Sequence, residues 1–261
     1  MSLKLICGLC LILLMFGTIP AQPSQEAGQS PATAYQKLLD EYEAGTKAIE
    51  LGPKFLELAE RHADDPVAVD ALVWVVTKLR NRPEATRALQ VLERDQLHNE
   101  RFSAACRQVA RSPALTSEKL LRTAMEKSRN EKVRGEACRQ LAFLLDQEAS
   151  VVEQLKKEPD DAARVLQYYG AEYGKHLKSL DRAQLDKKRE QHFELMLKSF
   201  ADVSTPDGTL GDVAKKALFR IRHLSIGRVA PEIAGEDIFG KTFKLSEHRG
   251  KVVVLSFWGH W

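Results

Sequence analysis

The four cysteines are the residues of this 261-residue sequence best suited to covalent chemistry, because a thiolate can attack a disulfide. Cys7 and Cys10 have Cys-x-x-Cys spacing, but they lie in a continuous apolar segment where no folded scaffold would lower a thiol pKa. We interpret that spacing as a coincidence. Cys106 and Cys138 each lie on the apolar side of a helical pattern, where cysteine commonly serves as a small buried side chain. We expect both to be buried, and a disulfide between them is the alternative.

The histidines, glycines and charges indicate no further chemistry. None of the seven histidines has metal-ligand spacing with another histidine or a cysteine, so we predict no metal site. The segment Gly235–Gly240 lacks the glycine density and the strand-to-helix setting of a nucleotide loop, and we predict no cofactor. The formal charge of +3 is spread over the chain and gives no reason to expect a nucleic-acid partner. No catalytic residue is predicted.

The first 21 residues are typical of a secretory signal peptide. Lys4 is the only charge before the apolar run Leu5–Phe16, and a small residue, Ala21, follows it. An uncleaved membrane anchor is the alternative, although about 20 apolar residues are needed to cross a bilayer and this run is shorter. We therefore expect an exported protein, periplasmic or otherwise extracytoplasmic, that meets the membrane only through its N-terminal signal or anchor.

The middle of the chain is predicted to be helical throughout. Residues 22–32 are polar, contain proline and glycine, and are predicted to form a linker. From residue 33 to residue 224, apolar residues recur at helical spacing with charged residues between them. Asp65 and Pro66 supply an N-cap and a first-turn proline for one of these helices. Helices joined by short turns predict antiparallel neighbours.

A weak internal repeat lies within this helical region. Ala104–Ala110 and Glu136–Ala142 match at a separation of 32 residues. Such a period is typical of stacked helix pairs of the TPR or HEAT kind, and a plain bundle with chance similarity is the alternative. Arg107 and Arg139 occupy equivalent repeat positions, which favours a packing or ion-pair role over a ligand-binding role.

Three tyrosines lie close together near the far end of the helical region, at Tyr168, Tyr169 and Tyr173. Aromatic residues at helical spacing usually belong to the core, and we expect that here. The alternative is that they line a groove for a partner.

The pattern changes at residue 225. Glu236–Lys241 has turn chemistry and Thr242–Leu245 alternates polar and apolar residues, so this part predicts a β-hairpin. Ser246–Lys251 is predicted to be a short turn or helical loop. The run Val252–Phe257 is apolar on both faces, which predicts a central strand covered by helices on either side.

Four motifs follow one another in this terminal segment: Gly227-x-x-Ala-Pro231, Asp237-x-x-Gly-Lys241, Leu245-Ser-x-x-Arg-Gly-Lys251, and Val252–Trp261, which ends in Phe-Trp-Gly-x-Trp. In this order they resemble the start of TlpA/ResA-type thioredoxin-like proteins, in the wider AhpC/TSA redoxin superfamily. The match covers residues 226–261. The helical region resembles, more loosely, the helical extension that some exported redoxins carry.

The resemblance implies a thiol–disulfide oxidoreductase that acts on disulfide-containing envelope proteins or with a membrane thiol reductant. Phe257 and Trp258 match the strand end beneath the active site, and Trp261 matches the tryptophan before the first catalytic cysteine. No Cys-x-x-Cys pair follows in this sequence, so we expect a redoxin domain cut before its active site and no thiol–disulfide exchange by this polypeptide. Ser256 stands where many thioredoxins carry a proton-accepting aspartate.

The expected fold is therefore mainly α: a helical array or bundle over residues 33–224, then the incomplete start of an α/β thioredoxin-like domain over residues 225–261, made of a β-hairpin and a first central strand. The alternative function is an exported helical protein-interaction scaffold whose redoxin segment is vestigial.

Overall fold

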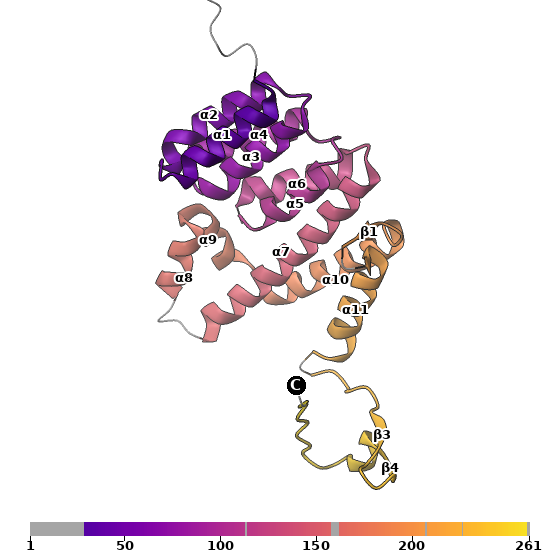
Figure 1. Ribbon diagram of the computed structural model, residues 1–261. Coiled ribbons are helices and arrows are strands. Elements are labelled where there is room, and N and C mark those ends of the chain that lie inside the picture. The colour runs from indigo at the N-terminus through magenta and orange to yellow at the C-terminus, as the bar shows by residue number, and fades with distance from the viewer. Residues whose placement is uncertain (1–28, 113, 158–161, 207, 226, 260–261) are drawn as a thin grey trace, which may run out of the picture.

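The computed structural model describes residues 29–112, 114–157, 162–206, 208–225 and 227–259, and this part of the chain is mainly helical (Figure 1). Its α-helices are α1 (Pro31–Glu43), α2 (Ala48–Arg61), α3 (Pro66–Lys78), α4 (Pro83–Asp95), α5 (Phe102–Ala110), α6 (Leu115–Lys127), α7 (Glu131–Lys157), α8 (Ala162–Tyr169), α9 (Ala171–Ser179), α10 (Arg182–Ser199) and α11 (Leu210–His223). The strands are β1 (Ser204–Thr205), β2 (Gly208–Thr209), β3 (Ala234–Glu236) and β4 (Thr242–Lys244), in two antiparallel pairs. The predicted mainly helical chain is thus confirmed.

Side-chain caps set several helix starts. The Asp65 carboxylate accepts a hydrogen bond from the amide of Val67 at 2.9 Å, directly before Pro66, as the sequence predicts. Thr209 and Asp212 form a reciprocal capping box at the start of α11. The first helix begins at Pro31, two residues earlier than expected, because Ser30 caps it through the amide of Thr33.

The helices from α1 to α7 pack on their near neighbours in the chain. Helix α3 contacts α2, α4 and α5, and α5 in turn contacts α6 and α7. The two repeat copies lie on α5 and α7, which pack against each other. The sequence similarity therefore marks two helices that share one interface.

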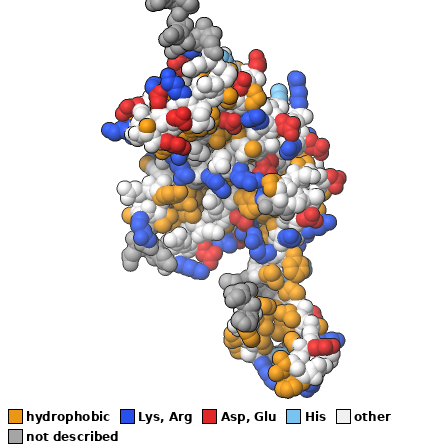
Figure 2. All heavy atoms as spheres, in the orientation of Figure 1, with side chains coloured by type: hydrophobic (Ala, Val, Ile, Leu, Met, Phe, Trp, Pro, Cys, Tyr) orange, Lys and Arg blue, Asp and Glu red, His pale blue; other side chains and the backbone are white. Residues whose placement is uncertain are grey.

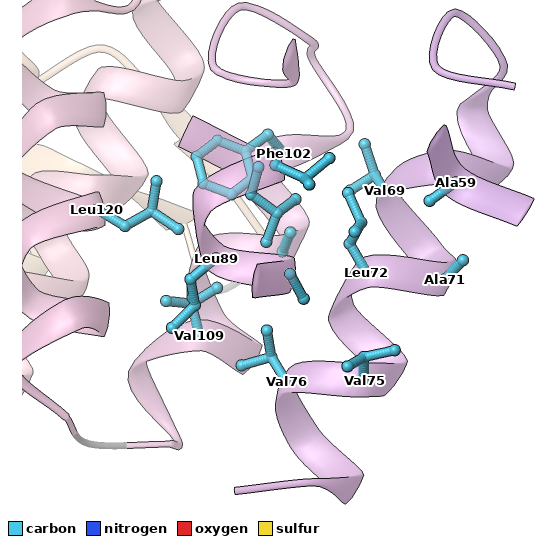
Figure 3. Close-up of a cluster of buried hydrophobic side chains, with 14 of the residues drawn as sticks. Ala59, Val69, Ala71, Leu72, Val75, Val76, Leu89, Phe102, Val109 and Leu120 are labelled. Atoms are coloured by element: carbon cyan, nitrogen blue, oxygen red, sulfur yellow. The ribbon is translucent and has the colours of Figure 1, made fainter. Parts of the chain in front are cut away.

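The largest core draws its buried side chains from six helices, α2 to α7. Phe55 is fully buried and its ring stacks on that of Trp74, with centroids 4.0 Å apart. Figure 3 shows Leu72 and Val76 of α3 pointing toward Phe102 and Val109 of α5. Burial of such apolar side chains is the main stabilising contribution in a helical protein of this kind.

Helix α7 is the longest helix of the described chain and joins its separate cores. It packs on α5, α6, α9 and α10. It contributes buried side chains to each of four hydrophobic clusters, among them Val133, Leu141, Cys138, Ala142, Leu145, Val152 and Val151.

The segment after α11 begins with the predicted hairpin. Strands β3 and β4 pair antiparallel with Gly235 opposite Phe243. In the turn, the Asp237 carboxylate accepts hydrogen bonds from the amides of Phe239 and Lys241, both at 2.9 Å, and Gly240 has a φ of +77°. A short 3-10 helix, η3 (Leu245–His248), follows where a turn or helical loop was expected.

The predicted central strand over Val252–Phe257 is not formed. The structure has no strand between Val252 and Gly259, and Val252 is 97% exposed and Trp258 87% exposed. A strand needs a hydrogen-bonded neighbour, and within the described residues no third strand joins the β3–β4 pair. Within the described residues, the predicted β-hairpin is therefore present and the predicted central strand is not.

The distribution of side chains differs between the two parts of the chain. Figure 2 shows Lys, Arg, Asp and Glu side chains interspersed over the helical region, and hydrophobic side chains gathered on the terminal segment. Among the described helices, none combines the length and the apolar character that a bilayer crossing would need. The predicted signal peptide over residues 1–21, with Cys7 and Cys10, lies outside the described residues.

Candidate functional site

The two described cysteines are buried and unpaired. Cys106 on α5 and Cys138 on α7 have no exposed surface and form no disulfide, so the prediction of small buried side chains is confirmed. Burial raises the pKa of both thiols, that of Cys138 to about 12, and the charge of Glu136 adds to the rise at Cys106. A thiol held protonated and away from solvent cannot exchange disulfides.

The two repeat arginines have Glu136 as a common partner. Arg107 lies 3.9 Å and Arg139 3.6 Å from the carboxylate of Glu136, which is itself buried. Gln140 donates a further hydrogen bond to this carboxylate at 2.7 Å. A buried carboxylate needs such partners, so these arginines have the ion-pair role that the repeat suggested.

A cavity of about 300 Å³ lies where three connections of the helical region meet. Its walls come from the α3–α4 turn, the start of α6 and the α8–α9 turn. Three aromatic rings line it, those of Tyr168, Tyr169 and Tyr173. The rings form a continuous group, with centroids 5.1 Å apart for the first pair and 5.8 Å for the second.

The expectation that all three tyrosines are core residues is wrong. Tyr173 is buried, but Tyr169 is only partly buried and Tyr168 is 64% exposed. The reason is long-range packing, since the α8–α9 turn lies against the α3–α4 turn from a distant part of the chain. Arg80 donates a hydrogen bond to the Tyr168 hydroxyl at 2.9 Å, and its guanidinium lies 5.9 Å from the ring centroid. The alternative interpretation, a groove lined by tyrosines, is the one that the structure supports.

The electrostatics of the cavity are set by helix ends and arginines. Helices α4, α6 and α9 all begin at its wall, with Arg82, Ala114 and Gly170 as N-caps, and none of the three has a side-chain cap. Free amide groups and the positive ends of helix dipoles favour hydrogen-bond acceptors and anions. Arg80 also lines the cavity, and Glu172 is the acidic residue on its wall.

A polar cluster lies next to the cavity, around the hydroxyl group of Tyr173. The Tyr173 hydroxyl donates to the Glu148 carboxylate at 2.8 Å, and His176 Nε2 lies 3.1 Å from the same oxygen. Burial and the nearby Glu148 charge raise the pKa of Tyr173 above its ordinary value. Glu118 completes the cluster and pairs with Arg122 at 2.6 Å.

Glu118, Glu148 and His176 each offer an atom that could bind a metal, all within 4.8 Å of one another. Sequence reasoning predicted no metal site because it looked for histidines and cysteines at short spacing. These three residues come from α6, α7 and α9 and carry no such spacing. Only the fold brings them together.

The predicted flanking residues of a redoxin site lie elsewhere. Phe257 and Trp258 are each 87% exposed in the terminal segment and do not line the cavity. Trp261 lies outside the described residues. No protein-family model matches the sequence, and no curated protein or solved structure is significantly similar to it.

Proposed function

We propose that the helical region is a scaffold of stacked helix pairs that binds a partner polypeptide, with the tyrosine-lined cavity as the binding site. The observation that carries this proposal is Tyr168, a large aromatic side chain left mostly exposed at a cavity mouth while Arg80 fixes its orientation. Aromatic and arginine side chains are the residues that most often dominate protein recognition. A mostly exposed tyrosine hydrogen-bonded to an arginine has this character.

The shape and charge of the cavity define the ligand. A volume of about 300 Å³ is at the small end of ligand sites and accommodates one or two side chains of a partner. Three uncapped helix starts and Arg80 favour a carboxylate, and the tyrosine rings favour an apolar or aromatic neighbour. We therefore propose an acidic residue next to an apolar one in the bound segment.

Selection from a random peptide library on the immobilised full chain tests this proposal. We expect the selected peptides to pair an acidic with an apolar residue, and to bind Tyr168→Ala and Arg80→Gln at least about tenfold more weakly. Arg61→Gln is the matched control, because Arg61 is an exposed arginine whose one ion pair within the described residues is with its helix neighbour Glu57. Failure to enrich any peptide, or equal binding to all variants, would contradict the proposal.

A second candidate is the role that the sequence resemblance implies. We propose that a longer form, continuing through a Cys-x-x-Cys pair, would be an exported thiol–disulfide oxidoreductase, periplasmic or otherwise extracytoplasmic or anchored by its N-terminus. It would act on disulfide-containing envelope proteins or with a membrane thiol reductant, whereas residues 226–261 contain no cysteine and this polypeptide is expected to be inactive. The support is that Asp237-x-x-Gly-Lys241 forms the hairpin turn, and that η3 begins within Leu245-Ser-x-x-Arg-Gly-Lys251.

Two measurements test the second candidate. Reading the coding DNA past the codon for Trp261 should show a Cys-x-x-Cys pair in frame or in a shifted frame. Insulin reduction by dithiothreitol should proceed no faster with this polypeptide than without it, because its described thiols are buried. Turnover above the protein-free rate would show that the thiols of this chain react after all.

A further inference from the structure

The polar cluster of Glu118, Glu148 and His176 has the composition of a transition-metal site. It combines one imidazole nitrogen with two carboxylates, and imidazole with carboxylate is a ligand set that zinc commonly takes. We propose that these three side chains bind one Zn²⁺ ion, which links α6, α7 and α9.

The positions of the three residues favour a defined site. Glu118 lies in the first turn of α6, Glu148 in the middle of α7 and His176 in the last turn of α9. Side chains held by helices are positioned more precisely than side chains on loops. Removing one ligand would therefore not be compensated by a neighbouring loop residue.

Burial makes a cation at this position favourable. The Glu148 side chain is only 6% exposed, and those of Glu118 and His176 are 22% and 25% exposed. Two carboxylates this close together repel each other, and the repulsion grows as water is excluded. The two carboxylates balance the charge of one divalent ion, and the Arg122 guanidinium on Glu118 adds one positive charge at the edge of the site.

The surrounding residues orient the ligands as outer partners do in known metal sites. The Tyr173 hydroxyl donates to Glu148, and Arg122 binds Glu118 through both Nε and Nη2. Tetrahedral zinc with bonds of 2.0–2.2 Å places its ligand atoms about 3.4 Å apart. The three ligand atoms lie within 4.8 Å of one another, so the widest separation must close by about 1.4 Å. The quarter-exposed side chains of Glu118 and His176 have room for that movement.

The competing interpretation is a hydrogen-bonded network without a metal. In that case Arg122 pairs with Glu118, and Tyr173 and His176 hydrogen-bond to Glu148. The two interpretations predict different results when the protein is stripped with EDTA and titrated with Zn²⁺. A network needs no ion, whereas the proposed site takes up one.

The test uses the full chain without a polyhistidine tag. We expect one Zn²⁺ per chain by elemental analysis after dialysis, and a higher thermal midpoint for the loaded protein. His176→Gln and Glu118→Gln should each weaken binding in calorimetry by at least about tenfold. His248→Gln is the matched control, since His248 is an exposed histidine in η3, and its affinity should equal that of the unmodified protein.

Several results would overturn the proposal. They are the absence of stoichiometric binding, equal affinity in His176→Gln, or an equal loss in the control. Binding that survives His176→Gln but not Glu118→Gln would indicate a carboxylate site for a hard cation instead of zinc. Cobalt substitution of the unmodified protein gives an answer independent of the variants: tetrahedral bands without sulfur charge transfer support the site, and thiolate bands would assign the metal to Cys106 or Cys138.

Discussion

The hydroxyl group of Tyr173 is predicted to be a main stabilising contact between α9 and α7. It donates a 2.8 Å hydrogen bond to Glu148, a carboxylate that is almost fully buried. Hydrogen bonds to charged groups contribute about 1.5–3 kcal/mol, and a buried acceptor that loses its donor keeps its desolvation cost. Tyr173→Phe should therefore lower the free energy of unfolding by about 1.5–3 kcal/mol, or the thermal midpoint by roughly 3–12 °C for a domain of this size.

Urea unfolding followed by circular dichroism at 222 nm measures this change. EDTA is kept present so that no bound ion contributes. Tyr169→Phe is the matched control, because it removes a hydroxyl from the same aromatic group and the structure shows no side-chain hydrogen bond for Tyr169 within the described residues. Equal urea midpoints and equal slopes for Tyr173→Phe and Tyr169→Phe would show that the bond to Glu148 does not stabilise the fold.

Four further outcomes are expected. Cys106 and Cys138 should not react with a disulfide reagent at pH 8 until urea unfolds the chain. A pKa of about 12 leaves about 10⁻⁴ of the Cys138 thiol ionised at that pH. Rapid labelling of the folded protein would contradict the burial of the two thiols. Phe55→Ala should cost about 3–5 kcal/mol in urea unfolding, because it empties a fully buried site, and a cost below 1 kcal/mol would show that the core is not packed as described. Burial lowers the pKa of His192 in the folded chain, so as the pH falls below about 6.5 the unfolded chain takes up the proton more readily than the folded one. The free energy of unfolding should therefore fall more steeply between about pH 7.5 and 5.5 for the unmodified protein than for His192→Gln. Equal pH dependence of the two proteins would contradict this. Amide hydrogens of Val252–Trp258 should exchange at nearly unprotected rates, and strong protection in a monomer would mean that this segment has found a strand partner.

Features that depend on neighbouring residues were predictable from the sequence. The helix start at Asp65 and Pro66 needs only a cap and a fixed φ angle, and the structure has it. The hairpin turn at Asp237 likewise depends on hydrogen bonds within five residues. The burial of Cys106 and Cys138 follows from helical periodicity alone.

Features that depend on distant partners were not predictable. The exposure of Tyr168 is decided by Arg80, which is 88 residues away in the chain. The cluster around Glu148 draws on three helices, and no spacing in the sequence marks it. The strand expected at Val252 fails for the same reason, because apolar residues favour a strand only where another strand offers its edge.

Helix α7 gives the helical region a property that stacked helix pairs commonly lack. In a linear array each unit touches only its neighbours, so units can be lost or gained at the ends, and unfolding can proceed from one end. Here one helix contributes to all four hydrophobic clusters, and melting it would open every one of them together. The helical region should therefore unfold as one cooperative unit, and α7 fixes the distance between the cavity and the helices α10 and α11.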